Sequence, residues 1–291
     1  GHPAQSDVLK ESSMDTSISS VLPQLTPRFT NVFSGIWGDD QLKQGAPAIY
    51  ATEARDTTSA TYRFISTASV IDGLRNVGFE PVHARQAIAR HGATNFGRHL
   101  VRFRRRFETV EVADAVPELC LLNSHDGTSA YQLRVGLYRA VCRNGLMVTI
   151  GGFHAVYIAH RGVQVETVVT RALEVAERFG HLGEVARRMT ERVLTSDEQH
   201  GFAARALALR FAPEDQTGMR VDQVLETRRA EDAGDDLWRV YNRAQESLMA
   251  GGLHRRSESG RLTRTRRIRA IREEVRINTS LWQIATHLLA A

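Results

Sequence analysis

Lysine is almost absent from this sequence. Its 291 residues include 38 Lys and Arg together, and only Lys10 and Lys43 are Lys, which leaves 36 Arg. Arginine presents a planar fork of donors that suits phosphate and carboxylate, whereas lysine is a mobile point charge. Because a GC-rich genome by itself favours Arg codons, the positions of the arginines are more informative than their number.

Cysteine and long apolar runs are also scarce. The two cysteines, Cys120 and Cys142, both lie in apolar stretches. One pair in a chain of this length does not describe a disulfide scaffold, so we expect buried thiols in a reducing cytosol. No segment approaches 18 apolar residues, and the N-terminus lacks the basic and apolar segments of a secretory signal. The composition therefore predicts a cytoplasmic protein that does not enter a membrane.

The usual catalytic signatures are missing as well. There is no GxxxxGK[ST] phosphate loop and no GxSxG nucleophile, and Cys142 lacks the surroundings of a thiol protease. The glycine pairs at 35–38 and 151–152 do not join a parallel strand to a crossover helix, so they are not dinucleotide fingerprints. We therefore expect no cofactor, and a binding protein rather than an enzyme.

Charge is distributed unevenly along the chain. Residues 251–291 hold nine Arg and three Glu, a net +6, so the rest of the chain, whose total is +5, carries a net −1. Residues 81–107 hold seven Arg and no acid, whereas residues 213–236 hold eight acids and three Arg. The two basic segments point to a polyanionic partner. For the C-terminal one, the acidic stretch of a neighbouring subunit is a rival partner.

The first half of the chain shows mainly strand patterns. We expect an irregular arm over 1–45, short strands over 48–53 and 62–66, and a helix that begins at Ser69 and is stopped by Gly78. Residues 99–107 alternate as a strand with a basic outer face. Over 118–161 the alternation and the turn dipeptides Asp126-Gly127 and Asn144-Gly145 predict an antiparallel meander of about four strands.

The second half changes to helical periodicity. We expect a long helix over 166–194 with a break near 180–183, a helix opened by the capping box of Thr195 and Glu198, and helices over 235–250 and 278–289. Residues 261–276 are predicted to be helical or disordered. The predicted fold is α+β: an antiparallel β-meander packed by a long helix, followed by an all-helical C-terminal half. The predicted domains are 1–45, 46–200 and 201–291.

The most chemically dense motif is the pentapeptide Asn123-Ser124-His125-Asp126-Gly127. Adjacent His and Asp side chains could bind a metal, together with His154, or act as acid and base. In a strand, however, adjacent side chains point to opposite faces. We favour a structural turn whose polar groups satisfy their own backbone, and keep the catalytic interpretation as the rival.

The arginines are interleaved with aromatic residues. Phe96, Phe103 and Phe107 lie in the first basic segment, and Tyr131 and Tyr138 lie in the meander. Arginines beside stacking aromatics are typical of sequence-tolerant single-strand binders. The alternative is that the aromatics are core and the arginines pair with acids such as Glu108, Glu111 and Asp114. The candidate nucleic-acid-binding residues are Arg98, Arg102, Arg104, Arg105, Arg106, Arg134, Arg139, Arg143 and Arg161.

Residues 121–148 read LLNSHDGTSAYQLRVGLYRAVCRNGLMV. This string resembles the phage- and plasmid-encoded family catalogued as domain of unknown function 932, whose hallmarks are N-S-H-D-G-[ST]-S and then G-[LFY]-[FY]-R-x-V-C-x-N-G-L. The resemblance extends less densely over roughly residues 60–200, and the last 90 residues carry no recognised signal. The matching residues are Asn123 to Ser129, Gly136, Leu137, Tyr138, Arg139, Val141, Cys142, Asn144, Gly145 and Leu146.

Members of that family sit on mobile elements, which implies a role in DNA replication, recombination or transfer, or in evading host defence. A meander followed by a long helix is also similar, at the level of fold alone, to the ring-forming single-strand annealing proteins. The leading hypothesis is a mobile-element protein that binds single-stranded DNA and promotes annealing as a homo-oligomer. The alternatives are a metal-dependent phosphodiester-cleaving enzyme and an anti-defence interaction protein that binds an acidic partner.

Overall fold

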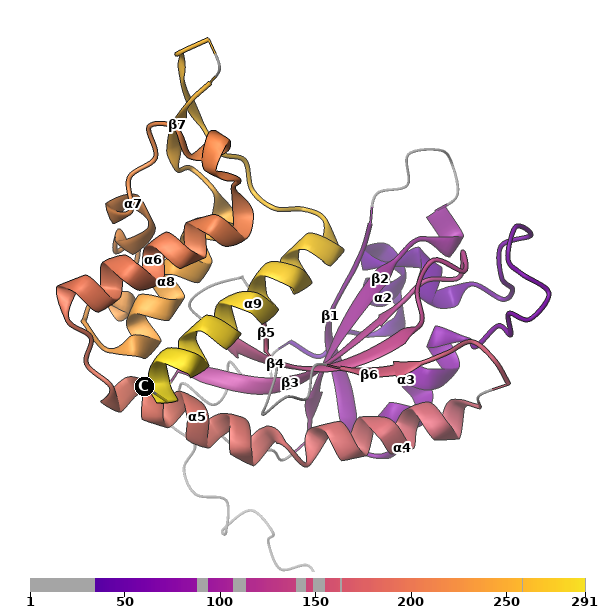
Figure 1. The fold of residues 1–291 in the computed structure, drawn as a ribbon. Coiled ribbons are helices and arrows are strands. Elements are labelled where there is room, and N and C mark those ends of the chain that lie inside the picture. The colour runs from indigo at the N-terminus through magenta and orange to yellow at the C-terminus, as the bar shows by residue number, and fades with distance from the viewer. Residues whose placement is uncertain are drawn as a thin grey trace, which may run out of the picture. The chain divides into compact units, whose positions relative to one another are not determined.

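A six-stranded antiparallel sheet organises the protein. The computed structural model describes residues 35–87, 94–106, 114–139, 145–148, 155–162, 164–257 and 259–290 (Figure 1). Five strands are neighbours in the sheet in the order of the chain. They are β1 (Phe79–Gln86), β2 (His99–Arg105), β3 (Ala115–Asn123), β4 (Tyr131–Arg139) and β5 (Gly145–Val148). The short strand β6 (Val156–Ile158) pairs with β4 instead of continuing past β5. The predicted meander is confirmed.

The two faces of the sheet pack against different helices, as strand alternation requires. One face buries Val101, Phe103 and Leu121 in the main core, which also contains residues of the helices on that side. These helices are α3 (Thr67–Asn76), α4 (Val165–Ala176) and α5 (Phe179–Glu191). On the other face a smaller cluster joins Leu100, Cys120 and Leu122 to Ile271 and Val275. The last two belong to α9 (Ile271–Ala290), so α9 and the α4–α5 pair lie on opposite faces (Figure 1).

The C-terminal helices start and stop at the expected signals. Thr195 accepts a hydrogen bond from the Glu198 amide, and Glu198 accepts one from the Thr195 amide, which opens α6 (Ser196–Arg210). Asp236 caps α8 (Leu237–Ala250), and Gly251, with φ of +74°, ends it. The short α7 (Asp222–Leu225) and the 3₁₀ turns η4 (Pro213–Gln216) and η5 (Ala230–Asp232) connect them. None of the described helices is long and apolar enough to cross a bilayer.

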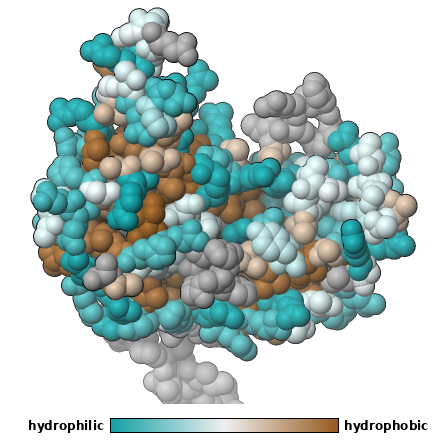
Figure 2. Space-filling model, viewed as in Figure 1, coloured by the Kyte–Doolittle hydropathy of each residue, from teal (hydrophilic) through white to brown (hydrophobic). Residues whose placement is uncertain are grey.

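One hairpin interrupts this helical region. Strands β7 (His254–Arg256) and β8 (Leu262–Arg264) pair in antiparallel register and project from the helices beneath them (Figure 1). Hydrophilic and intermediate residues cover this hairpin, whereas hydrophobic residues gather over the helices below it (Figure 2). The α+β class is confirmed, and the hairpin is the exception to the all-helical C-terminal half.

The segment before β1 differs most from the prediction. Residues 1–34 lie outside the described part of the chain, but α2 (Asp39–Gly45) lies within the arm predicted to be irregular. Residues 47–50 form a 3₁₀ turn, η2 (Pro47–Tyr50), where a strand was expected, because Pro47 occupies its first position and suits a helical start. Residues 62–66 form no strand and lead into α3. A further 3₁₀ turn, η3 (Thr94–Phe96), precedes β2.

Two helix boundaries also differ from the predicted positions. The α3 helix is capped by Ser66, whose side chain accepts from the Ser69 amide, so it begins before the predicted Ser69. The long helix predicted over 166–194 is two helices, separated at Glu177 and Arg178 rather than at the nearby glycines. Residues 36–291, with the sheet and the C-terminal helices, belong to one compact unit.

Candidate nucleic-acid interface

The turn at Asn123–Gly127 is embedded in the protein. Asn123, Ser124 and His125 are 0 % exposed. The His125 amide donates to the Phe96 carbonyl at 3.0 Å, and the Arg55 amide donates to the His125 carbonyl at 2.9 Å. Backbone hydrogen bonds on both sides therefore hold the turn between η3 and the segment after η2.

The hydroxyl of Thr67, in the first turn of α3, is the centre of a buried polar network. His99 Nε2 lies 3.0 Å and His125 Nε2 lies 3.3 Å from Thr67 Oγ1. Asn123 Nδ2 donates to the same oxygen at 3.1 Å, and Asn123 Oδ1 lies 2.9 Å from His160 Nε2. These contacts join the start of α3 to β2, to the end of β3 and to the segment after β6.

Two tyrosines close this network. Tyr131 OH donates to the Ile65 carbonyl at 3.0 Å and lies 3.1 Å from Thr67 Oγ1. The ring of Tyr62 stacks on His160 with centroids 4.4 Å apart, and its hydroxyl donates to the Ser124 carbonyl at 3.3 Å. The network is packed under aromatic rings and its side chains bond to one another, but the buried Nδ1 of His125 has no hydrogen-bond partner among the described residues.

The histidines of the network are neutral at pH 7. Burial lowers the pKa of His99 to about 4, and burial together with the nearby His99 and His160 lowers that of His125 to about 3. Burial also lowers the pKa of His160. His99 Nδ1 contacts the Gly97 carbonyl at 2.9 Å and must therefore carry the proton. Its Nε2 is then free to accept from the Thr67 hydroxyl.

Asp126 points away from this network. Its Oδ1 accepts from Ser124 Oγ at 2.7 Å, from the Thr128 amide at 3.0 Å and from Thr128 Oγ1 at 2.7 Å. Burial raises the pKa of Asp126, but these hydrogen bonds outweigh it and lower the pKa overall. Asp126 therefore bonds to its own turn, as the structural interpretation expects, whereas His125 bonds to the distant Thr67. His154 lies outside the described residues. Within the described ranges no three His, Cys, Asp or Glu side chains are placed to hold a metal.

Arg102 and Arg104 share one buried carboxylate. Arg102 donates to Glu118 through Nε at 2.5 Å and through Nη2 at 2.9 Å, and Arg104 Nε donates to Glu118 at 2.8 Å. The Glu118 side chain is only 2 % exposed. Both guanidinium groups lie over the Tyr138 ring, at 4.0 and 5.0 Å from its centroid. The face predicted to be basic and exposed is therefore packed, and Glu118 offsets one of its two positive charges.

Arg139 is buried and joins the sheet to the helical region. It forms ion pairs with Asp114 and, at 2.7 Å, with Asp232. Trp238 Nε1 donates to Asp114 at 3.0 Å, which adds α8 to the same cluster. Pairing with internal acids such as Asp114 is the predicted alternative to nucleic-acid binding, and Arg139 forms such a pair with Asp114.

The other predicted arginines are dispersed. Arg106 pairs with Glu80, and the buried Arg134 donates to Tyr157 OH at 3.0 Å. Arg98 is half-buried and lies 3.4 Å from the Thr128 carbonyl. Arg105 and Arg161 are exposed, and Arg143 lies outside the described residues. Of the nine candidates, the structure brings Arg102 and Arg104 together on one carboxylate. In that position few of their N–H donors are accessible to a phosphate.

A second group of arginines lies on the hairpin and the segment that follows it. We call residues 254–272 the arginine arm. It holds eight arginines, and all except the half-buried Arg255 are exposed. Arg255 pairs with Asp215 at 3.0 Å, Arg256 donates to the Gly260 carbonyl, and Arg264 donates to His254. Five have no side-chain hydrogen bond or ion pair to any residue that the structure describes: Arg261, Arg266, Arg267, Arg269 and Arg272.

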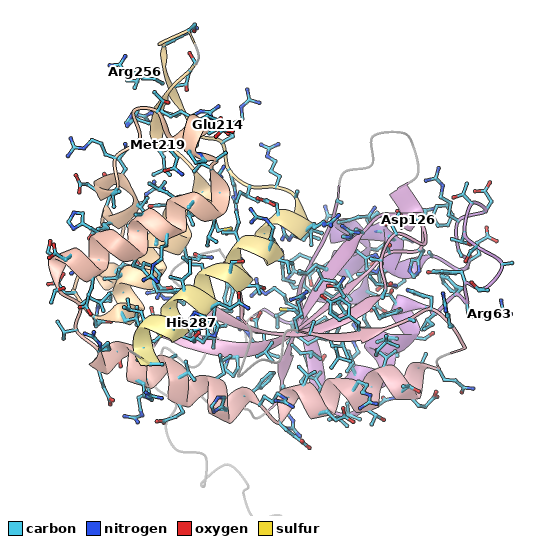
Figure 3. All side chains as sticks on the ribbon, viewed as in Figure 1. Arg63, Asp126, Glu214, Met219, Arg256 and His287 are labelled. Atoms are coloured by element: carbon cyan, nitrogen blue, oxygen red, sulfur yellow. The ribbon has the colours of Figure 1, made fainter. Side chains whose placement is uncertain are left out.

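Only the positive net charge of residues 251–291 pointed to the arm in the sequence. No motif lies there, and the hairpin was not predicted. Arg256 of the arm and Asp126 of the turn lie in well-separated places (Figure 3). The arm and the polar network are therefore distinct features of the molecule.

Comparison with known proteins extends the resemblance found at 121–148. The family model for the domain of unknown function DUF932 matches residues 55–282. The UPF0380 proteins YafZ and YfjQ of Escherichia coli K12 are 38% and 37% identical over 251 residues, which cover 86% of this chain and 90% of each relative. No solved structure matches the chain. The expectation that the last 90 residues carry no family signal was wrong, since the match includes the arginine arm and most of α9. The chain belongs to the DUF932 family.

Proposed function

We propose that this protein binds single-stranded DNA through the arginine arm and promotes strand annealing as a homo-oligomer. The observation that carries the proposal is the group of five exposed arginines, in one segment, without a partner among the described residues. Each guanidinium can give paired donors to a phosphate. Neutralised phosphates repel less, so two complementary strands can approach each other on such a surface.

The arm is favoured over the β2 arginines because its charges are available. Moving Arg102 to a phosphate would break its two hydrogen bonds to Glu118 and leave that buried carboxylate with Arg104 as its remaining ion-pair partner. Arg267 or Arg272, in contrast, exchanges water for phosphate without breaking an ion pair. Binding to the arm would release counterions and so weaken steeply with salt.

The alternative partner for the arm is an acidic protein surface. Within this chain, the acidic stretch 213–236 already contacts part of the arm. Asp215, in the acidic stretch, pairs with Arg255, and the Arg256 amide donates to the Thr217 carbonyl. The acidic stretch of the same chain therefore engages the base of the hairpin and leaves the arginines after it uncovered. An anti-defence protein with an acidic partner would bind the arm but would show no oligonucleotide affinity at physiological salt.

The test is fluorescence anisotropy with labelled oligo-dT over a range of salt concentrations. A variant with Arg266, Arg267, Arg269 and Arg272 all replaced by Ala should bind at least tenfold more weakly. The slope of log K against log salt should flatten by about 3, since each phosphate contact on a single strand contributes about 0.7.

The matched control removes four exposed arginines from α4 to α6: Arg171, Arg187, Arg188 and Arg205. It changes the net charge equally and should keep most of the affinity. An equal loss in both variants, or no binding by the unaltered protein at low salt, would refute the proposal. Light scattering with and without oligo-dT measures the oligomeric state.

A further inference from the structure

Among the residues that the structure describes, Tyr157 is the only exposed aromatic side chain. It lies in the middle of β6 and is 59 % exposed. Of the aromatics predicted to stack on bases, Phe103 and Tyr131 are fully buried, and the ring of Tyr138 is covered by two arginines. An aromatic ring that is open to solvent is the group on which a nucleobase stacks, whatever its sequence.

The side chain of Tyr157 is held in place by β4. Arg134 Nη2 donates to the Tyr157 hydroxyl at 3.0 Å, and the guanidinium carbon of Arg134 lies 5.9 Å from the centroid of the ring. Arg134 itself is buried and also donates from Nη2 to Gln132 Oε1 at 3.2 Å. Because the hydroxyl end of the ring is anchored, less conformational entropy is lost when a base stacks on it.

A polar group lies beside the ring on the same face of the sheet. Gln132 is opposite Tyr157 in the β4–β6 register, and Arg134 follows Gln132 by two residues on β4. The Tyr157 hydroxyl and Gln132 Oε1 both accept from Arg134 Nη2, so the amide lies next to the phenol. Gln132 is half-exposed, and its Nε2 donates to none of the described residues. A base stacked on Tyr157 therefore finds a hydrogen-bond donor for its edge.

The arginine arm ends on this face of the sheet. Ile271, the first residue of α9 and the second-last of the arm, belongs to the small apolar cluster that contains Leu122. Leu122 is opposite Gln132, and Gln132 is opposite Tyr157, so two strand spacings of about 4.8 Å each separate Leu122 from Tyr157. The end of the arm and the exposed ring are thus close enough to contact one bound strand.

We propose that Tyr157 is a stacking site for an unpaired base of a nucleic-acid strand. The inference rests on the proposed function: the arm contacts the phosphates, and Tyr157 adds a contact to a base. In a duplex each base is already paired and stacked, so its face is closed to a ring on the protein surface. Phosphate contacts carry no such distinction. The site therefore gives the protein a preference for single strands over duplex.

The experiment measures anisotropy of the full chain with labelled oligo-dT, an abasic oligomer of the same length, and a duplex. The unaltered protein should bind oligo-dT about tenfold more tightly than the abasic oligomer, since one stacked base contributes about this factor. Tyr157→Leu keeps an apolar side chain but removes the ring. It should weaken oligo-dT binding by about tenfold and leave binding of the abasic oligomer and the duplex unchanged.

Two controls isolate the ring. Tyr157→Phe keeps the ring without its hydroxyl and should bind oligo-dT within about twofold of the unaltered protein. Val193→Ala alters another exposed apolar side chain, between α5 and α6, and should keep the preference for oligo-dT. Because Tyr157→Leu changes no charge, it should leave the slope of log K against log salt as it is, whereas loss of the arm arginines flattens it.

The outcomes separate the two proposals. Equal, arm-dependent binding of oligo-dT and the abasic oligomer would overturn the stacking site and leave the proposed function standing. An equal loss by Tyr157→Leu on all three ligands would also overturn it, since a strand without bases cannot lose a base contact. No binding of any ligand would overturn both proposals. A changed oligomeric state of Tyr157→Leu in light scattering, with the preference for oligo-dT retained, would assign the ring to a contact between copies instead.

Discussion

The arginines of β2 and those of the arginine arm are chemically the same and are used differently. On β2, Arg102 and Arg104 share Glu118, and Arg106, just beyond the strand, pairs with Glu80. In the arm, five of eight arginines have no partner among the described residues. The difference shows that a run of basic residues in a sequence predicts a basic surface only where the fold supplies no carboxylates to it.

Glu118→Gln should produce the largest effect and separates the two regions most clearly. It leaves Arg102 and Arg104 partly buried beside a neutral amide, and we expect the free energy of unfolding to fall by about 3–5 kcal/mol. Urea denaturation measures this change. The matched control is Glu273→Gln, which breaks the exposed pair with Arg276 and should cost at most about 1 kcal/mol. Equal effects of the two substitutions would contradict the comparison.

Acidification should destabilise the sheet and leave the arginines of the arm charged. The pKa of His99 is about 4 in the folded protein, against 6.5 for an ordinary histidine, so the unfolded chain binds more protons between these values. Stability is therefore complete above pH 6.5 and is lost as the pH falls toward 4, by about 3 kcal/mol for His99 alone.

Urea midpoints measured between pH 7.5 and 4 test this expectation. The variant His287→Gln alters an exposed histidine of α9 and should reproduce the pH dependence of the unaltered protein. A flat profile would contradict the expectation, because it would show that the buried histidines have the same pKa in the folded and unfolded states.

The two regions should also differ in their contribution to DNA binding. The candidates Arg104 to Arg106 were predicted from the sequence, and that prediction stays open. Because two of the three are paired with carboxylates, Arg105→Ala/Arg106→Ala should weaken oligo-dT binding by less than about threefold. Arg266→Ala/Arg267→Ala removes the same number of charges and should weaken it by about tenfold. Anisotropy titrations of both variants at one salt concentration compare their losses of affinity. A larger loss for Arg105→Ala/Arg106→Ala would indicate that β2, and not the arm, carries the interface.

The smallest effect should be that of the arm on stability. Exposed side chains without partners contribute little to the folded state, so Arg267→Ala or Arg269→Ala should change the free energy of unfolding by less than about 0.5 kcal/mol. Thermal unfolding of both variants measures this. A loss above 1 kcal/mol would mean that the arm has structural partners, and would remove the contrast with β2.

Local sequence patterns predicted the elements that depend on local chemistry. The alternation of Val101 and Phe103 identified β2, the Asp126-Gly127 dipeptide identified a turn between two strands, and the capping box of Thr195 identified the start of α6. The hairpin β7–β8 was missed because its strands, His-Arg-Arg and Leu-Thr-Arg, span only three residues each and are rich in Arg, which is not among the residues enriched in strands. The 3₁₀ turn at Pro47 was missed because a short apolar segment also fits a strand.

The candidate sites were predicted less completely. The Asn123–Gly127 motif was identified, but its partners were not: Thr67 and His160 are 56 and 37 residues from Asn123 in sequence, and His99 is 32 residues from Thr67. No period or spacing connects a threonine in a helix to a histidine in a strand, since only packing brings them together. The arm was identified by its charge, but the close approach of Gly251 to the Arg266 backbone was not predicted.

The sequence by itself determined β2, the strands of the meander, the start of α6, the family motif and the total charge of each segment, because these depend on neighbouring residues. Only the tertiary structure decided which arginines are neutralised. The β2–β3 register sets Arg102 opposite Cys120 and Phe103 opposite Leu119, so Glu118 follows beside Arg104. That register is set by which side chains the sheet buries, and a shift of one residue would have moved the carboxylate to the other face. Among the described residues, β7 and β8 pair only with each other and carry no carboxylate, so most charges of the arm stay exposed.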